Sequence, residues 1–253
     1  MNIMDVVERI SRLKNVDEFE SSIGDILLTL GFDFWVYTVK MPNSFEGNPL
    51  ELEVFHNWTS REFVERYATI HAGNCYKFDH LWKMETPIIY DDKFIDRDIK
   101  MIKMLKPESA AVIQEEIDFG FQGYGFSLST HGKYGEKGVL TLSNGGSNGG
   151  GRRKDGIDAI SISFPLASAF FPFMHMKYIE LKGWTPPGGL FLLTDRELEC
   201  LRWAAGGKSA WETGMILDIS ERTVIFHLAN AQKKLMATNK IQAVARAVLY
   251  NLL

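Results

Sequence analysis

Five side chains near the C-terminus have the types and the spacing of a surface that binds nucleic acid. They follow one another along a single predicted helix: Arg222, Phe226, Asn230, Lys233 and Lys234. Guanidinium and amide groups can hydrogen-bond to base edges, and ammonium groups can bind phosphate oxygens. The sequence therefore predicts that this helix turns these side chains to solvent and presents them to the major groove of a DNA duplex.

The elements that would position these side chains are two short helices. The second, about Glu221–Leu235, has an apolar stripe with spacings of four, three and four residues, made of Val224, Leu228, Ala231 and Leu235. The first covers about Ala210–Leu217, and only the three residues 218–220 separate the two. Because so short a connection makes helices cross steeply, the pair is typical of a helix-turn-helix.

Start and stop signals predict two further helices around this pair. Three helix starts combine an N-cap with a carboxylate or an amide three residues later: Thr194 with Glu197, Ser209 with Glu212, and Asn239 with Gln242. Ser220 is a simple N-cap without such a partner. Gly206 and Gly207 end the first of the four helices, where a left-handed backbone costs glycine little.

The segment from Leu193 to Leu252 resembles the C-terminal domain of the LuxR family of transcriptional regulators. The resemblance runs through LTDRE, LRWAAGGKS, ISERTV, FHL and KL, and then through N-K-x-Q-A-V-A-R-A. It implies a four-helix DNA-binding domain whose third helix reads the major groove. Ile225 stands where many relatives carry a lysine, which predicts weaker phosphate contacts. The DNA-contacting residues implied by position are Lys208, Ser220, Glu221, Arg222, Thr223, Phe226, His227, Asn230, Lys233 and Lys234.

The charge of this segment is only weakly favourable for DNA. From Gly188 onward eight basic residues face six acidic ones, a net charge of +2, whereas the whole chain has −4. A single copy should bind DNA weakly, which predicts a homodimer on a palindromic operator of about twenty base pairs. The candidate dimer contact is an apolar stripe on the last helix: Ile241, Val244, Ala245, Val248 and Leu252.

Composition restricts the class of protein further. The chain has 253 residues, 45% of them hydrophobic and 24% charged, which is typical of a globular protein. It lacks an uninterrupted apolar run of eighteen residues and a secretory signal, so no membrane association is expected. Two cysteines, Cys75 and Cys200, fit a reducing cytoplasm. The sequence contains no metal-ligand spacing, nucleophile elbow or dinucleotide fingerprint, so we expect neither an enzyme nor a bound cofactor.

The first 180 residues alternate between helix and strand patterns, which predicts an α+β layer architecture. Helices are expected at 2–13, 16–30, 60–69 and 157–181, the last with kinks at Pro165 and Pro172. Strands are expected at 32–40, 51–58, 124–130 and 138–143, and a flexible loop at 143–156. The predicted organisation is a first domain at 1–182, a Gly/Pro linker at 183–189 and a helical domain at 190–253.

Several N-terminal segments resemble the sensor domain of the same family. They are LGFDFWVYTV, HNWTS, Pro87–Tyr90 and STHGKYGEKGVLTLS. The resemblance implies an α/β/α sandwich with a central antiparallel sheet, which encloses an acyl-homoserine lactone or another small-molecule signal. An aromatic pair can sandwich a lactone-like ring, and hydroxyls can bind its carbonyls. Carried over by position, the ligand-binding residues are Val36, Thr38, Trp58, Tyr67, Tyr76, Asp79, Tyr90, Phe126, Ser127 and Thr141.

One departure from the family pattern concerns the ligand's amide group. Relatives carry an Asp-Pro pair whose carboxylate accepts the amide N–H, and this chain has no such pair. By spacing, Asn74 or Tyr76 lies nearest that position, and Asp79 could replace it only after a local insertion. The sequence therefore predicts a signal other than a standard acyl-homoserine lactone, or weak binding of one.

Two other kinds of regulator remain as alternatives. A ligand-independent regulator would fill its sensor core with its own aromatic side chains, notably Trp35, Tyr37 and Trp58. A phosphorylation-dependent response regulator would need an acidic pair at the end of its first strand, and FDFWVYTVK does not supply one. In each case the predicted partners include double-stranded DNA, and the resemblance adds RNA polymerase.

Overall fold

The computed structural model describes residues 2–42, 52–57, 80–83, 86–90, 102, 104, 106–118, 124–144, 153–184 and 193–253. Their contacts divide the chain into two compact units. The N-terminal unit comprises residues 1–132 and 136–182, and the C-terminal unit comprises 183–253 with the short segment 133–135. Residues 185–192 lie outside the described residues, so the limits of the predicted linker stay a prediction.

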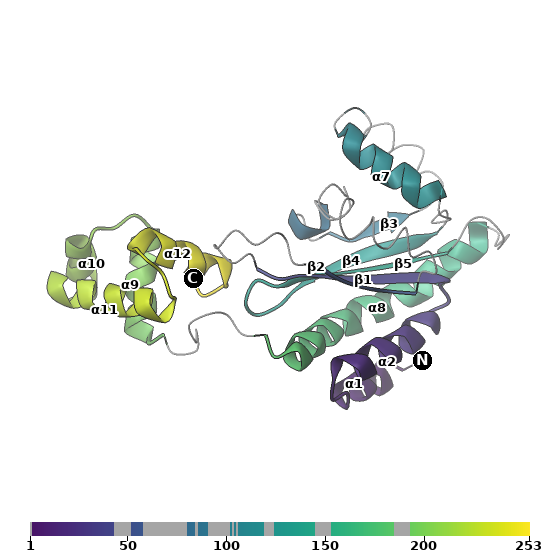
Figure 1. The fold of residues 1–253 in the computed structure, drawn as a ribbon, viewed down its shortest axis with the longest axis horizontal. Coiled ribbons are helices and arrows are strands. Elements are labelled where there is room, and N and C mark those ends of the chain that lie inside the picture. The colour runs from purple at the N-terminus through teal and green to yellow at the C-terminus, as the bar shows by residue number, and fades with distance from the viewer. Residues whose placement is uncertain are drawn as a thin grey trace. The chain divides into compact units, whose positions relative to one another are not determined.

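The N-terminal unit is built on a five-stranded antiparallel sheet (Figure 1). Its strand order is β2-β1-β5-β4-β3. The strands are β1 (Phe34–Lys40), β2 (Leu52–His56), β3 (Ile88–Tyr90), β4 (Gly125–His131) and β5 (Lys137–Ser143). The hairpin of β4 and β5 lies at the centre, and it pairs Ser127 with Thr141 and Leu128 with Leu140.

Helices lie on both faces of this sheet (Figure 1). The helices α1 (Ile3–Ser11), α2 (Val16–Leu28) and α8 (Arg153–Lys182) cover one face, which we name the α8 face. The helix α7 (Pro107–Asp118) lies on the other, the α7 face. This arrangement confirms the predicted α+β architecture with a central antiparallel sheet.

An aromatic cluster holds the helices to the α8 face. Tyr37 of β1 stands within 6.1 Å, centroid to centroid, of Phe19 of α2 and within 5.8 Å of Tyr178 of α8. Phe171 approaches Tyr37 edge-on at 5.9 Å. All four side chains are almost completely buried. Because each buried aromatic side chain removes a large apolar area from water, this cluster fixes α2 and α8 on β1.

The helix α8 was predicted from the sequence, but its start and its apolar character differ from the prediction. It begins at Arg153 rather than Ile157, so it includes the end of the predicted loop. It contains Pro165 and Pro172 within one helix, as predicted, and the kinks expected there stay a prediction. Its segment Ile157–Lys182, with a mean hydropathy of 1.5, is also long and apolar enough to cross a membrane, although it packs against β4 and α1.

Among the elements whose bounds the structure describes, β3 and α7 were not predicted. The strand β3 has only three residues, too few for a period of two to be recognised. The helix α7 starts with Pro107 and has Glu108 in its first turn, and these start signals could have revealed it. The expected helix at 60–69 lies outside the described residues.

The C-terminal unit contains four helices among its described residues. They are α9 (Asp195–Ala205), α10 (Ala210–Leu217), α11 (Glu221–Lys234) and α12 (Lys240–Leu249). Each was predicted, and the predicted starts and the ends of the first three agree within one or two residues, whereas the stripe predicted for the last helix runs to Leu252, beyond the end of α12 at Leu249. Their shared core includes Cys200, Leu201, Val224, Leu228, Ala231 and Ala247. The four-helix region therefore agrees with the fold class expected from the sequence.

Candidate nucleic-acid interface and ligand site

The helix starts of the C-terminal unit have the expected caps. Thr194 and Glu197 form a reciprocal capping box, and so do Ser209 and Glu212. Ser220 accepts a hydrogen bond from the backbone N–H of Thr223 at 3.1 Å. The start at Asn239 is different, because the Gln242 side chain accepts from Thr238 rather than from the N-cap backbone. Gly207, with a φ of 81°, supplies the left-handed residue after α9.

The turn between α10 and α11 is tight because two residues permit a close backbone approach. Asp218 takes the left-handed conformation, with φ 54° and ψ 46°. Gly214 of α10 lies so near the turn that a Cβ atom there would stand 2.7 Å from the carbonyl oxygen of Ile219. Only glycine leaves this space free. The close approach of the turn to α10 therefore depends on Gly214, a residue that was not among those predicted from the sequence.

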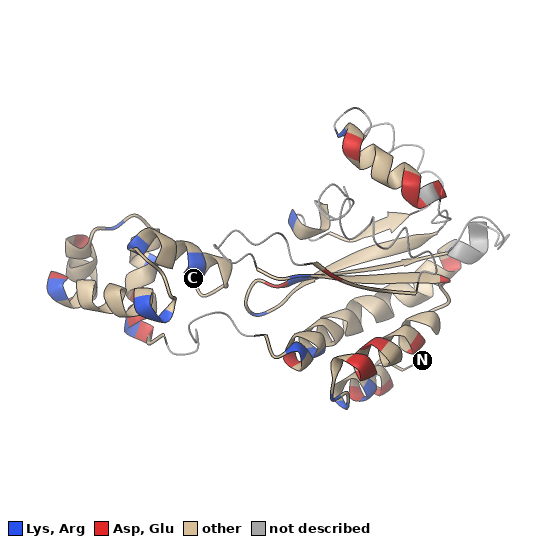
Figure 2. Ribbon diagram, in the orientation of Figure 1, with Lys and Arg blue, Asp and Glu red and all other residues tan. Residues whose placement is uncertain are grey.

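The helix α11 divides cleanly into a buried and an outer face. Val224, Ala231 and Leu235 are fully buried and Leu228 nearly so, as the apolar stripe predicted. Arg222, Phe226 and Lys233 point into solvent. The remaining predicted contacts are partly accessible or lie at the helix start: Lys208, Ser220, Glu221, Thr223, His227 and Asn230. One exposed helix face thus carries a guanidinium, an ammonium and an aromatic ring, and Figure 2 shows the cations of this unit in blue.

Lys234 does not belong to this outer face. Its ammonium group lies 2.8 and 3.0 Å from the carboxylate oxygens of Glu197, which is almost fully buried in α9. Burial raises the pKa of Glu197, but hydrogen bonds from Lys234 and from the Thr194 backbone outweigh it and keep this pKa below its ordinary value. The prediction that Lys234 points to solvent was wrong, because the lysine is recruited to the buried carboxylate.

Arg246 of α12 is a second cation that is used inside the unit. It is buried, and its guanidinium donates to the carbonyl oxygens of Leu235 at 2.7 Å and Met236 at 2.6 Å. These carbonyls end α11, where positive charge is favourable. The sequence charge of +2 therefore overstates the cationic charge that this unit can offer to phosphates.

In the N-terminal unit, five predicted ligand residues share the α7 face of the sheet. Strand alternation and register place Val36, Thr38, Tyr90, Ser127 and Thr141 there. The hydroxyl groups of Tyr90, Ser127 and Thr141 form a hydrogen-bonded chain, with 2.6 Å between the Ser127 and Thr141 oxygens. Next to them lies an apolar cluster that includes Leu81, Ile88, Val112 and Val139. The face combines neutral hydrogen-bonding groups with apolar surface.

Two more hydroxyls on this face have unused hydrogen-bonding capacity. Thr38 is completely buried, and its Oγ1 has no hydrogen-bond partner in the described part of the chain. The same holds for the buried Oγ of Ser129. Both residues stand opposite Val139 in the sheet register, one on each side. Because a buried hydroxyl without a partner is costly, these groups suit a bound polar ligand.

Phe126 was expected to line the same site, and the structure places it elsewhere. It precedes Ser127 on β4, so its side chain projects from the opposite, α8 face. There it packs edge-on against Phe32 at 5.4 Å and Phe164 at 5.3 Å. The prediction for Phe126 was therefore wrong, because adjacent strand residues cannot both face one pocket. The expected ligand residues Trp58, Tyr67, Tyr76 and Asp79 lie outside the described residues.

A polar network on the α8 face was not anticipated from the sequence. The hydroxyl of Tyr37 lies 2.7 Å from Nδ1 of His175, and Tyr178 donates to Glu53, which also pairs with Lys182 at 2.9 Å. Burial, with the nearby His131, lowers the pKa of His175 to about 4, so its ring is neutral at neutral pH. Burial likewise raises the pKa of Tyr37. This network joins α8 to β1 and β2 and is structural.

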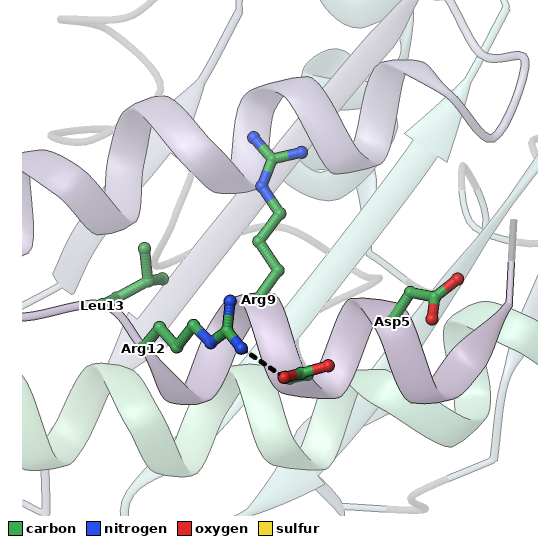
Figure 3. A pocket seen from close by; sticks show the side chains of 5 residues that line it. Asp5, Arg9, Arg12 and Leu13 are labelled. Atoms are coloured by element: carbon green, nitrogen blue, oxygen red, sulfur yellow. Dashed lines mark hydrogen bonds and ion pairs between the residues drawn. The ribbon is translucent and has the colours of Figure 1, made fainter.

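A surface hollow beside α1 has a different character. It has a volume of about 320 Å³ and is lined by Asp5, Glu8, Arg9, Arg12 and Leu13. Arg12, the C-cap of α1, pairs with Glu8, and this pair is the dashed line in Figure 3. Arg9 pairs with Asp25 of α2 at 3.0 Å. Both guanidinium groups are thus engaged in ion pairs. Within the described part of the chain, no group of three or more His, Cys, Asp or Glu residues could hold a metal ion.

A helix-covered antiparallel sheet in one unit and a helix-turn-helix in the other have the architecture of a two-domain DNA-binding regulator. Comparison with known families agrees: "Bacterial regulatory proteins, luxR family" matches residues 192–247, and "Autoinducer binding domain" matches residues 15–169. The chain belongs to the LuxR family of transcriptional regulators with an autoinducer-binding domain, which are not enzymes.

Individual relatives cover nearly the whole chain. The HTH-type quorum sensing-dependent transcriptional regulator RpaR of Rhodopseudomonas palustris is 30% identical and spans 100% of this chain and 94% of its own. The transcriptional activator protein AhyR of Aeromonas hydrophila is 27% identical, over 97% and 90% respectively. The crystal structure of Escherichia coli SdiA, at 22% identity, covers 99% of this chain and 97% of its own, with a TM-score of 0.68, and so shares its fold.

Proposed function

We propose that this protein is a quorum-sensing transcriptional regulator that binds an acyl-homoserine lactone or a related small signal and then binds a palindromic operator as a homodimer. The observation that carries the proposal is α11, whose inner face is buried while Arg222, Phe226 and Lys233 stand in solvent. The relatives RpaR, a quorum sensing-dependent transcriptional regulator, and AhyR, a transcriptional activator, support the same role.

The α7 face favours an uncharged ligand with carbonyl or hydroxyl groups and an apolar tail. The Tyr90–Ser127–Thr141 chain is neutral, and so is the Thr38 hydroxyl, which has no partner among the described residues. These groups can donate to or accept from such a ligand. The cluster around Val139 provides apolar surface for an acyl chain. Acyl-homoserine lactones fit this description, and so does octanoyl-rac-glycerol, with which SdiA forms a complex.

Coupling between ligand and operator follows from binding energetics. A ligand that binds only the folded N-terminal unit would stabilise it by about 3 kcal/mol at a hundredfold excess over Kd. A folded dimer would then raise the effective concentration of the second C-terminal unit at the operator. In α12, Ile241 and Val248 expose their apolar side chains and are the proposed dimer contacts. Binding would occur in the cytoplasm, with RNA polymerase as the further partner.

The DNA-binding part of the proposal is tested by comparing two single alanine substitutions in the full-length chain. Arg222→Ala should weaken operator binding about tenfold or more, because a guanidinium contact to a base or phosphate is lost. Arg196→Ala is the matched control, since Arg196 is exposed on α9 and pairs with Glu199 at 2.9 Å. Both variants should melt like the parent. Equal operator affinity of parent and Arg222→Ala in a gel-shift titration would contradict the proposal.

The ligand-binding part is tested by melting the protein with a panel of acyl-homoserine lactones and with octanoyl-glycerol. A ligand-induced rise in Tm that is reduced in Thr141→Val supports the site. The missing Asp-Pro predicts small shifts with standard lactones, so a large lactone shift that disappears in Asp79→Ala would refute that part. Mass spectrometry of copurifying molecules would identify another signal.

The second candidate is a regulator that needs no ligand. Two of the three aromatic residues expected to fill its sensor core, Trp35 and Tyr37, alternate onto the α8 face and pack beneath the helices. They therefore do not fill the α7 face. Full operator affinity of ligand-free protein, with no Tm response to any compound, would nevertheless establish this candidate over the first.

A further inference from the structure

An isoleucine interrupts the polar character of the outer face of α11. Ile225 is the fifth residue of the helix and is 53% exposed. Arg222 lies three residues before it, one turn away, and Phe226, 60% exposed, follows it directly. The apolar stripe of α11 is complete without Ile225, because Val224 and Leu228 already fill the core positions in this turn of the helix.

Local folding does not explain this residue. A β-branched side chain is a weaker helix former than lysine or arginine, so Ile225 adds nothing to the stability of α11 by propensity. Single exposed apolar side chains are common on protein surfaces and need no explanation where the surface has no ligand. Here, however, Ile225 lies in the first half of the helix that is proposed to enter the major groove, where side chains reach base edges.

The chemistry of base edges limits what an isoleucine can recognise. Its side chain has no donor or acceptor, so it cannot bind the polar edges of guanine, adenine or cytosine. The only apolar group in the major groove is the 5-methyl of thymine. Contact with that methyl removes apolar surface of both partners from water.

We propose that Ile225 is a specificity-determining residue that selects a thymine in each half of the operator by van der Waals contact with its 5-methyl group. The proposal rests on the proposed function, since it assigns a role within the DNA contact of α11. Arg222, one turn before it, supplies the polar contact, and Ile225 contributes sequence preference without contributing charge.

The first experiment isolates the methyl group. An operator is selected from random duplex DNA with the full-length chain. The compound present is the acyl-homoserine lactone or octanoyl-glycerol that gives the largest rise in Tm. Each thymine of the operator is then replaced singly by deoxyuridine. At one position in each half-site, deoxyuridine should weaken binding about fourfold, the value of one buried methyl-sized group. The same replacement should leave the affinity of Ile225→Ala unchanged. Met215→Ala, which removes a 69% exposed side chain from α10, should keep the deoxyuridine response of the parent.

The second experiment adds the charge that Ile225 lacks. Ile225→Lys should lose the thymine preference and steepen the dependence of log K on log salt by about 0.9 for each subunit, because one further phosphate contact releases counterions. Circular dichroism should show the same helix content and Tm for parent and variants, since the substituted side chain is largely exposed.

The outcomes separate this inference from the function on which it rests. If Arg222→Ala loses operator binding while no deoxyuridine position affects the parent, Ile225 does not read a methyl group and only this inference is overturned. An equal deoxyuridine effect in parent and Ile225→Ala overturns it as well. If the parent selects no duplex sequence at all, the proposed function fails together with it.

Discussion

The C-terminal unit and the α7 face of the N-terminal unit treat their buried polar groups in opposite ways. In the C-terminal unit, the buried Glu197 is held by Lys234 and by the Thr194 backbone, and Arg246 donates to two carbonyls at the end of α11. On the α7 face of the N-terminal unit, Thr38 and Ser129 have buried hydroxyls without a partner among the described residues. The C-terminal unit uses its own side chains to satisfy its buried polar groups. The α7 face keeps hydrogen-bonding capacity that a ligand can use.

Substitutions on the two faces of the sheet have the largest expected effect, and they test whether the α7 face is kept for a ligand while the α8 face serves stability. Phe126→Ala should lower the free energy of unfolding by about 3–5 kcal/mol, because Phe126 is fully buried against Phe32 and Phe164. Ser127→Ala, its neighbour on the α7 face, should cost far less stability and should instead weaken ligand binding. Urea titrations measure the first quantity, and ligand-dependent melting the second. If Phe126→Ala were as stable as the parent, the ring would not be part of the packed core, and its assignment to the α8 face would be wrong.

The buried ion pair of the C-terminal unit gives the next largest effect. Glu197→Gln should destabilise this unit by about 2 kcal/mol, less than for a fully buried pair because Lys234 is partly exposed. Since the pKa of Glu197 is lowered in the folded state, its contribution is complete above the ordinary pKa of 4.5 and is lost as the pH falls through the folded value. Thermal melts between pH 7 and pH 3 should show a shallower decline for Glu197→Gln.

Glu212→Gln is the matched control for this prediction. Glu212 occupies the corresponding place in the second capping box but is only paired with Lys208 at the surface, at 3.3 Å. Its replacement should leave the melting temperature nearly unchanged. Equal losses in the two variants would show that the capping box, and not the buried pair with Lys234, stabilises the unit.

The turn of the helix-turn-helix gives an effect of similar or smaller size. Gly214→Ala should cost about 1–3 kcal/mol, because its Cβ would stand 2.7 Å from the Ile219 carbonyl oxygen and push α10 away from the turn. Gly206→Ala is the control, since its nearest neighbour would be 3.5 Å away. Denaturant titration of both variants measures the difference. A Gly214→Ala protein as stable as Gly206→Ala would mean that the turn relaxes without strain.

The smallest effect concerns the hydroxyl of Thr38. Thr38→Val keeps the shape of the side chain and should raise the stability of the ligand-free protein by up to about 1 kcal/mol, because it removes a buried hydroxyl that has no partner in the part of the chain that the structure describes. Its ligand affinity should fall at the same time if the ligand bonds to this group. Melting with and without ligand separates the two effects. A ligand-free Thr38→Val protein that is less stable than the parent would indicate that the hydroxyl is already satisfied.

Local signals explain why the C-terminal unit could be read from its sequence. A capping residue acts within three or four positions, so Thr194, Ser209 and Ser220 place three helix starts without reference to the rest of the fold. The apolar stripe of α11 likewise requires only the helical period. In the N-terminal unit, alternation indicated β1, β4 and β5, but the short β3 and the helix α7 were missed.

The sequence by itself determined the four C-terminal helices, the apolar stripe beneath Arg222 and the alternation of the central strands, because these depend on neighbours a few positions apart. The tertiary structure alone decided that Lys234 and Arg246 turn inward, since their partners Glu197 and Leu235 lie 37 and 11 residues away. It also decided that Ser127 faces α7 while Phe126 faces α8, because the face of a strand is fixed only when its helices pack.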